Sequence, residues 1–163
     1  MTYGFKTLSS PLGLLTLVAS ARGLAAILWE NDDPRRVPLG PLVEAGDHPV
    51  LARTQAQLSE YFAGTRRAFD LPLDFTGTAF QKQVWSALLT IPFGQTRSYA
   101  DIARAIGRPT ACRAVGAANG RNPISIVAPC HRVIGVNGAL TGFAGGIAAK
   151  RRLLALEGLG MAA

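Results

Sequence analysis

The chain has 163 residues, the size of one mid-sized domain or two small ones, and can bury a hydrophobic core without disulfide bonds or metals. Hydrophobic residues at 48% and charged residues at 17% exclude a disordered chain. The two cysteines, Cys112 and Cys130, are too few for a disulfide framework or for a structural zinc site built from thiolates.

The net charge of +7 is concentrated in the second half of the chain. Residues 1–80 carry seven Lys/Arg and eight Asp/Glu, whereas residues 81–163 carry ten Lys/Arg and only two acids, Asp101 and Glu157. Fourteen of the seventeen cations are arginine, whose planar guanidinium suits the recognition of phosphates and bases. This distribution favours a nucleic acid or another polyanion as partner over a merely basic surface.

The apolar runs are too short for a membrane helix, which needs about 20 residues. Leu12–Val18, followed by Ala19–Ala21, has features of a signal peptide, but Gly13 and Thr16 interrupt it and Lys6 is the only cation before it. A strand is the better interpretation. We therefore expect a cytoplasmic protein with reduced thiols and no contact with a membrane.

The first half predicts a small mixed α/β domain over residues 1–74. Its expected elements, in chain order, are strands at Phe5–Leu8, Leu14–Ser20 and Leu24–Trp29, an irregular connector at Asn31–Gly46, a helix at His48–Phe62 and a short strand at Phe69–Leu73. His48 is interpreted as a helix-start or loop residue, because it has no partner at metal-ligand spacing. Nothing in this half indicates chemistry.

The second half, residues 75–163, predicts a mainly helical domain. Capping boxes at Thr78–Gln81 and Ser98–Asp101 begin two helices, and Thr110 can cap a further helix over Ala111–Asn119. Two short helices joined by a Gly/Pro turn are typical of a helix-turn-helix, with a helical hairpin in a core as the alternative. Five arginines surround this pair: Arg97, Arg104, Arg108, Arg113 and Arg121.

The second helix of the pair carries small side chains apart from Arg113. Small residues such as Gly116 and Ala117 let a helix backbone approach a groove wall, with Arg113 as a single probe. This suits DNA binding through phosphates and the minor groove, with little sequence preference. The alternative, that these residues merely permit close helix packing, explains everything except Arg113.

Cys130 is the candidate nucleophile. It ends an apolar run, Ile124–Val127, that predicts a strand, and it is followed by His131 and Arg132. Cationic or polarising neighbours favour the thiolate, which is the reactive form of cysteine. Cys112 lies on a predicted helix without such neighbours and is interpreted as a packing residue.

The neighbouring His131 is the candidate base. In an extended chain, adjacent side chains point to opposite faces, so His131 would take the Cys130 proton through a water molecule or after a backbone bend. A histidine acting as base is usually oriented by a third group. Asp101 is assigned to a helix cap, which leaves Glu157 as the candidate orienter; a solvated ion pair between Glu157 and a nearby arginine is the alternative.

The segment Pro129–Ile134 resembles the signature hexapeptide of the O6-alkylguanine-DNA alkyltransferases. The similarity runs from about Phe75 to Gly158, whereas the first half resembles the family only in its length and its order of strands and helix. The matching features are the helix at Phe80–Leu89, Ser98-Tyr99, Arg113–Gly116, Asn122-Pro123, Gly145-Gly146 and Lys150. The resemblance implies an α/β N-terminal domain and a C-terminal alkyltransferase domain with a helix-turn-helix.

The implied activity is direct DNA repair, in which Cys130 takes an alkyl group from O6 of guanine, with O4 of thymine as a second candidate position. The resemblance assigns His131 as the base acting through a water molecule, Glu157 as the group that holds His131, and Asn122 as a brace for the turn beside the cysteine. A thioether is not hydrolysed in the cell, so each molecule should act once. No metal or other cofactor is expected.

The implied partner is double-stranded DNA, bound through its minor groove by a monomer. The target nucleotide must flip out, because its reacting carbon is inaccessible inside a duplex. Arg113 would fill the vacated stack and Tyr99 would push the adjacent phosphate, with Arg108, Gly116 and Ala117 completing the DNA contacts. The residues implied for the base pocket are Tyr99, Ser125, Val133, Phe143, Ala144, Gly145 and Gly146.

Three residues depart from the family pattern. Phe143 stands in place of a usual tyrosine and lacks its hydroxyl, Ser125 occupies a position where some members have proline, and Cys112 replaces a commoner alanine. Two other functions compete with transfer. A lesion-sensing DNA-binding protein is disfavoured because such proteins lack the cysteine at 130, and a ligand-binding helix-turn-helix regulator is disfavoured by the alanine-rich second helix and the reactive motif.

Overall fold

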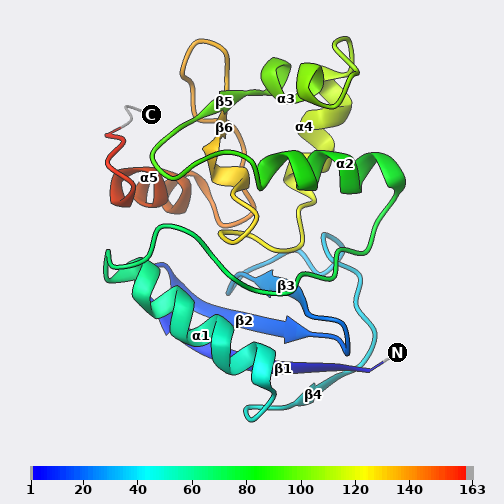
Figure 1. Ribbon diagram of the computed structural model, residues 1–163, viewed down its shortest axis with the longest axis vertical. Helices are drawn as coiled ribbons and strands as arrows, with labels where there is room; N and C mark the ends of the chain where they lie inside the picture. Colours follow the sequence, from blue (N-terminus) through cyan, green and yellow to red (C-terminus); the bar gives the residue numbers. More distant parts are fainter. Residues whose placement is uncertain (1, 161–163) are drawn as a thin grey trace. The chain divides into compact units, whose positions relative to one another are not determined.

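The computed structural model describes residues 2–160 (Figure 1). The chain divides into two compact units, with the boundary between Thr76 and Gly77. Among the described residues, no helix combines the length and hydrophobicity that crossing a bilayer requires.

The first unit is built on a four-stranded sheet of order β3-β2-β1-β4. Its strands are β1 (Tyr3–Ser10), β2 (Gly13–Ala19), β3 (Leu24–Leu28) and β4 (Leu42–Glu44). The first three are antiparallel neighbours, as their alternation and the turns between them predict, whereas β4 runs parallel to β1. Sequence reasoning missed β4, because all three of its residues are exposed at the sheet edge and show no alternation.

Helix α1 (Pro49–Phe62) lies along one face of this sheet (Figure 1) and buries Leu51, Leu58 and Tyr61 completely. The helix begins at His48, as predicted: its Nδ1 accepts a hydrogen bond of 3.2 Å from the amide two residues on. A further cluster of the core, Val18, Ala25 and Ala26, is covered by residues that include Val37 and Leu39 of the connector.

The strand predicted at Phe69–Leu73 is wrong. Leu73 forms only an isolated bridge with Leu24. The Pro72 carbonyl accepts from the Leu24 amide at 2.8 Å, and the Asp74 amide donates to the Leu24 carbonyl at 2.8 Å. Because proline has no amide hydrogen, the segment cannot extend this bridge into a full ladder.

The second unit is mainly helical, as predicted. Its elements are α2 (Ala79–Leu88), β5 (Arg97–Ser98), α3 (Tyr99–Ala105), α4 (Cys112–Gly120), the 3₁₀ turn η1 (Cys130–Arg132), β6 (Val133–Ile134) and α5 (Ile147–Leu156). Helices α2, α3 and α4 pack on one another, and the buried Trp85 donates from Nε1 to the Ala118 carbonyl at 2.8 Å. Strands β5 and β6 pair in parallel, which ties the start of α3 to the chain that follows Cys130.

Both predicted capping boxes are present. Thr78 Oγ1 accepts from the Gln81 amide at 3.1 Å while Gln81 Oε1 accepts from the Thr78 amide at 3.0 Å, and Ser98 and Asp101 make the same reciprocal pair. The predicted Thr110 cap is wrong. Helix α4 begins after Ala111, whose amide donates to the Arg108 carbonyl at 3.0 Å, so Thr110 lies inside a turn.

Candidate active site

The chain before Cys130 is a buried turn. Residues 122–134 are all buried. The Val127 amide donates to the Ser125 carbonyl at 2.9 Å, and Ile126 between them has φ 76°, which makes a γ-turn of the rare positive-φ form. A β-branched residue at positive φ is strained and persists only where the surroundings hold it. The strand predicted at Ile124–Val127 is therefore wrong, because tight turns fold this apolar run back on itself.

Asn122 spans this turn. Its Nδ2 donates to the Ala128 carbonyl at 2.8 Å, and its Oδ1 accepts from the Ile124 amide at 3.1 Å. The Ala128 carbonyl also accepts from the Cys130 amide at 2.8 Å, across Pro129 at φ −81° and ψ 66°, which is an inverse γ-turn. Asn122 thus contacts the turn directly beside the cysteine.

Cys130, His131 and Arg132 form a single 3₁₀ turn instead of the extended chain assumed from the sequence. Successive side chains in such a turn diverge by about 120° and do not point to opposite faces. The Cys130 residue is 3% exposed and His131 is completely buried. Both side chains therefore lie in the interior of the second unit.

Glu157, at the C-terminal end of α5, binds both neighbours of the cysteine. His131 Nε2 lies 2.8 Å from Glu157 Oε2, while Arg132 donates from Nε to Oε1 at 2.8 Å and from Nη2 to Oε2 at 3.0 Å. The Gly94 amide adds a bond of 3.2 Å to Oε1, and Arg132 Nη1 donates to the Ile91 carbonyl at 2.6 Å. Glu157 thus both orients His131 and forms an ion pair with an arginine, the two roles that the sequence offered as alternatives. The ion pair is buried and not solvated, with side-chain exposures of 7% for Arg132 and 0% for Glu157.

This arrangement assigns the tautomer of His131. Its Nε2 faces a carboxylate and so carries the proton, which leaves the lone pair on Nδ1. Nδ1 is buried and has no hydrogen-bond partner among the described residues. Burial lowers the pKa of His131 below its ordinary value of 6.5, although the hydrogen bond and charge of Glu157 act in the opposite direction. His131 is therefore a neutral imidazole at pH 7, with a free basic nitrogen.

Lys150 is a second buried cation near the cysteine. Its side chain is completely buried, and Nζ donates to the Val133 carbonyl at 2.7 Å. Burial lowers the pKa of Lys150, while the charge of Cys130 raises it. An ammonium group beside a sulfur favours the thiolate.

The sequence contains a pattern that could have assigned this role to Lys150. Lys150, Leu153, Leu154 and Glu157 follow the spacing of one helical face, and all four are buried. A buried face of α5 with a charged residue at each end indicates that both charges meet partners inside the fold.

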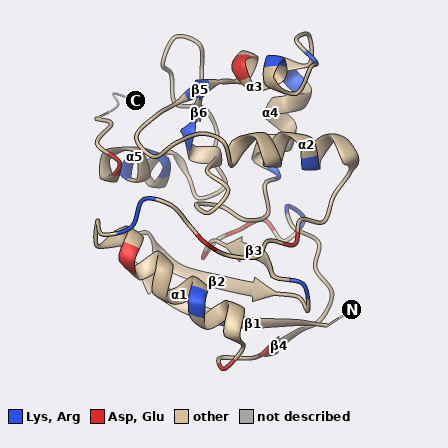
Figure 2. Ribbon diagram, viewed as in Figure 1, with Lys and Arg blue, Asp and Glu red and all other residues tan. Residues whose placement is uncertain are grey.

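The predicted DNA-contacting residues lie on or beside the helix pair α3–α4, where several arginines gather (Figure 2). Arg108, Arg113 and Ala117 are exposed, whereas Tyr99 and Gly116 are half-buried. A Cβ atom at Gly116 would lie 3.8 Å from Cδ1 of Tyr99, so the Tyr99 ring packs against the backbone of α4.

The predicted pocket residues differ in exposure. Ser125 and Val133 are completely buried, Phe143, Ala144 and Gly145 are half-buried, and Gly146 is exposed where α5 begins. Thr141, in the loop that leads to Phe143, was missed by sequence reasoning, although its side chain is hydrogen-bonded to the Tyr99 hydroxyl.

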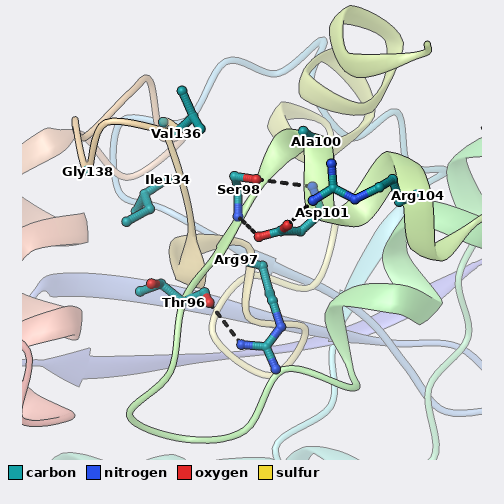
Figure 3. A pocket seen from close by; sticks show the side chains of 10 residues that line it. Thr96, Arg97, Ser98, Ala100, Asp101, Arg104, Ile134, Val136 and Gly138 are labelled. Atoms are coloured by element: carbon teal, nitrogen blue, oxygen red, sulfur yellow. Dashed lines mark hydrogen bonds and ion pairs between the residues drawn. The ribbon is translucent and has the colours of Figure 1, made fainter. Parts of the chain in front are cut away.

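A cavity of about 370 Å³ lies beside β5 and β6 (Figure 3). Its Ser98, Asp101 and Arg104 side chains bond to one another or to nearby backbone, and Arg97 is directed away from them, to the Thr96 carbonyl. The charged groups of this cavity thus have partners within its own lining. Within residues 2–160, no group of three or more His, Cys, Asp or Glu residues could hold a metal ion.

Comparison with known proteins gives the same family for both units. Residues 3–75 match the ribonuclease-like domain of 6-O-methylguanine DNA methyltransferase, and residues 79–159 match its DNA binding domain. The methylated-DNA–protein-cysteine methyltransferase of Mycobacterium tuberculosis is 50% identical over 155 residues, which cover 94% of this chain and 91% of that protein. The constitutive enzyme of Bacillus subtilis is 48% identical over 144 residues, 86% of each chain.

The fold agrees with these relatives. A crystal structure of Mycobacterium tuberculosis OGT in complex with DNA matches with a TM-score of 0.85 and 48% identity, over 95% of this chain and 93% of that chain. A second structure, of the O6-methylguanine methyltransferase from the same organism, gives a TM-score of 0.83 at 48% identity. The family expected from the hexapeptide around Cys130 is confirmed: the chain belongs to the methylated-DNA–protein-cysteine methyltransferases.

Proposed function

We propose that this protein repairs alkylated DNA directly, by transferring an alkyl group from O6 of guanine to Sγ of Cys130. O4 of thymine is a second candidate position of the lesion. The observation that carries the proposal is the 3₁₀ turn that places His131 directly after Cys130, together with the 2.8 Å hydrogen bond between His131 Nε2 and Glu157 Oε2. Membership of the family supports the same reaction.

The protonation states follow from the hydrogen bonds. His131 takes the thiol proton at Nδ1, through a bridging water molecule, because Nε2 is committed to Glu157. Arg132 holds both oxygens of Glu157 and so fixes the group that orients the base. The Lys150 ammonium stabilises the thiolate that results.

The transfer step is a displacement at carbon. The sulfur of Cys130 forms a bond to the alkyl carbon, the bond between that carbon and O6 breaks, and its electron pair passes to the guanine. The guanine anion then takes up a proton at N1, which balances the proton that Cys130 gave to His131, and the ordinary keto base is restored. The product on the protein is a thioether, which water does not cleave in the cell, so each molecule reacts once.

DNA binding is assigned to the helix pair of the second unit. We propose that double-stranded DNA lies against α4 through its minor groove, with Arg108, Arg113 and Ala117 at the surface and Gly116 allowing close approach. The damaged nucleotide flips out, Arg113 fills the stack and Tyr99 contacts the adjacent phosphate. The residues proposed to surround the flipped base are Tyr99, Ser125, Val133, Phe143, Ala144, Gly145 and Gly146.

The organisation around this site is part of the proposal. We assign residues 75–163 to the alkyltransferase domain and residues 1–74 to a separate α/β domain. The protein acts as a monomer in the cytoplasm, where its thiols stay reduced. Asn122 braces the buried turn and thereby fixes the position of the Cys130 backbone.

Intact-mass measurement tests the transfer. After incubation with a duplex containing O6-methylguanine, the protein should gain one methyl group in place of a hydrogen, and peptide mapping should place it on Cys130. Cys130→Ala should abolish the gain and keep DNA binding. Cys112→Ala is the matched control: this second thiol is exposed on α4, so the interpretation of Cys112 as a packing residue is wrong, and the variant should keep both. An unchanged wild-type mass with stoichiometric lesion would leave a lesion-binding protein that transfers nothing.

A second experiment separates the finger role of Arg113 from simple charge. Arg113→Ala should slow repair more than it weakens duplex affinity, because one cationic contact is a small share of total binding. Arg121→Ala, an exposed arginine directly after α4, is the matched control and should affect both only slightly. Equal losses of rate and affinity in Arg113→Ala would contradict the role.

A further inference from the structure

The loop between β6 and α5 is connected to α3 through a side-chain hydrogen bond. Thr141 is exposed in this glycine-rich loop, and its Oγ1 is hydrogen-bonded to the Tyr99 hydroxyl. Thr141 and Tyr99 are 42 positions apart in the sequence. The bond therefore joins the loop that leads to Phe143 to Tyr99, the first residue of α3.

Tyr99 itself is held firmly at its backbone and ring. Ser98, directly before it, caps α3 and pairs with Ile134 of β6, the strand that follows Cys130. The ring packs on α4 at Gly116, where a Cβ atom would be 3.8 Å away. Because the backbone and the ring of Tyr99 are both held in place, the hydrogen bond that its oxygen accepts determines the direction of its O–H bond.

The chemistry of two hydroxyls determines what this pair can do. A phenol has one proton to donate and two lone pairs that accept. When Thr141 donates to Tyr99 Oη, the Tyr99 proton is free for an acceptor outside the pair. A phosphate oxygen of DNA is such an acceptor, and hydrogen bonds to charged acceptors are stronger than neutral ones. Phe143, two residues after Thr141, has no hydroxyl and cannot replace it.

We propose that Thr141 is a positioning residue for DNA repair: its hydroxyl donates to Tyr99 and directs the Tyr99 proton at a phosphate of the bound strand. This inference rests on the proposed function. This role concerns the phosphate contact alone, so it does not extend to a substrate that carries no phosphate.

Two substitutions separate the hydroxyl of Thr141 from its shape. Thr141→Val keeps the branched side chain and removes the hydroxyl, whereas Thr141→Ser keeps the hydroxyl. With an O6-methylguanine duplex, Thr141→Val should slow single-turnover transfer by roughly five- to ten-fold, the scale of one hydrogen bond. Thr141→Ser should stay close to the wild-type rate. With free O6-methylguanine base, which has no phosphate, both variants should react like wild type.

A double-mutant cycle tests whether Thr141 acts through Tyr99. In a Tyr99→Phe background, Thr141→Val should cause no further loss of rate on the duplex. The inference is overturned if Thr141→Val lowers the duplex rate equally in both backgrounds, or if it slows the reaction with free base as much as the reaction with duplex. It is also overturned if wild-type protein transfers normally and Thr141→Val alone leaves the duplex rate unchanged. A wild-type protein that accepts no methyl group from the duplex would instead overturn the proposed function.

Discussion

Glu157→Gln probes the buried group behind the cysteine with a nearly isosteric change. The carboxylate accepts hydrogen bonds from His131, Arg132 and the Gly94 amide. An amide accepts only through its oxygen, so its NH₂ group must find an acceptor of its own. His131 can provide one by moving its proton from Nε2 to Nδ1. Nδ1 then has no lone pair for the Cys130 proton, and we expect the transfer rate to fall by about 10²–10⁴-fold.

The same substitution should lower stability strongly. Arg132 is 7% exposed at its side chain and would lose the only carboxylate that the structure places against it among the described residues. Removing one partner of a buried ion pair costs about 3–5 kcal/mol, because it leaves an uncompensated buried charge. A domain has about 5–15 kcal/mol of stability in total, so the variant should still fold at low temperature. Urea unfolding measures this loss.

Glu60→Gln is the matched control. Glu60 pairs with Arg66 at 2.7 Å, but the two side chains are 49% and 29% exposed. Removal of this charge should change stability by less than about 1 kcal/mol. A folded Glu157→Gln protein that transfers a methyl group at the wild-type rate would refute the tautomer argument. Equal stability losses in the two variants would refute the argument from buried charge.

Three further predictions concern stability. Asn122→Ala removes the acceptor of the buried Ile124 amide, whereas the Ala128 carbonyl keeps its hydrogen bond from the Cys130 amide, so urea unfolding should show a loss of about 1–3 kcal/mol. Gly23 has φ 155°, and a Cβ atom there would lie 2.5 Å from the Pro72 carbonyl oxygen, so Gly23→Ala should lower stability by more than about 2 kcal/mol in thermal unfolding. Gly46→Ala is the control and should be close to neutral, because a Cβ atom at Gly46 meets no atom within 4 Å. Because the pKa of His131 is lowered in the fold, the unfolded chain takes up the proton first as pH falls, and stability should decrease below about pH 6.5. Denaturation midpoints measured across this pH range should show the decrease, and the dependence should flatten in His131→Asn.

Local patterns determined much of this protein from the sequence alone. The capping boxes at Thr78 and Ser98 form between residues three apart, so they needed no knowledge of the fold. The alternation in β2 and the helical spacing in α1 are similarly local, because side-chain direction follows from the backbone of each element. The reactive cysteine was identifiable for the same reason: His131 is its neighbour in the chain.

The tertiary structure decided what those residues contact. Glu157 contacts His131 and Arg132 across 26 and 25 positions, whereas the sequence left open whether it orients His131 or forms a solvated ion pair with a nearby arginine. The run before Cys130 has the composition of a strand, yet Asn122 and the surrounding core hold it as two successive tight turns. Burial and hydrogen-bond partners depend on how distant elements pack, and a hydrophobic run looks the same in sequence whether it extends or folds back. For that reason the hydrogen-bond partners of His131, its tautomer and the hydroxyl pair at Tyr99 became visible only in three dimensions.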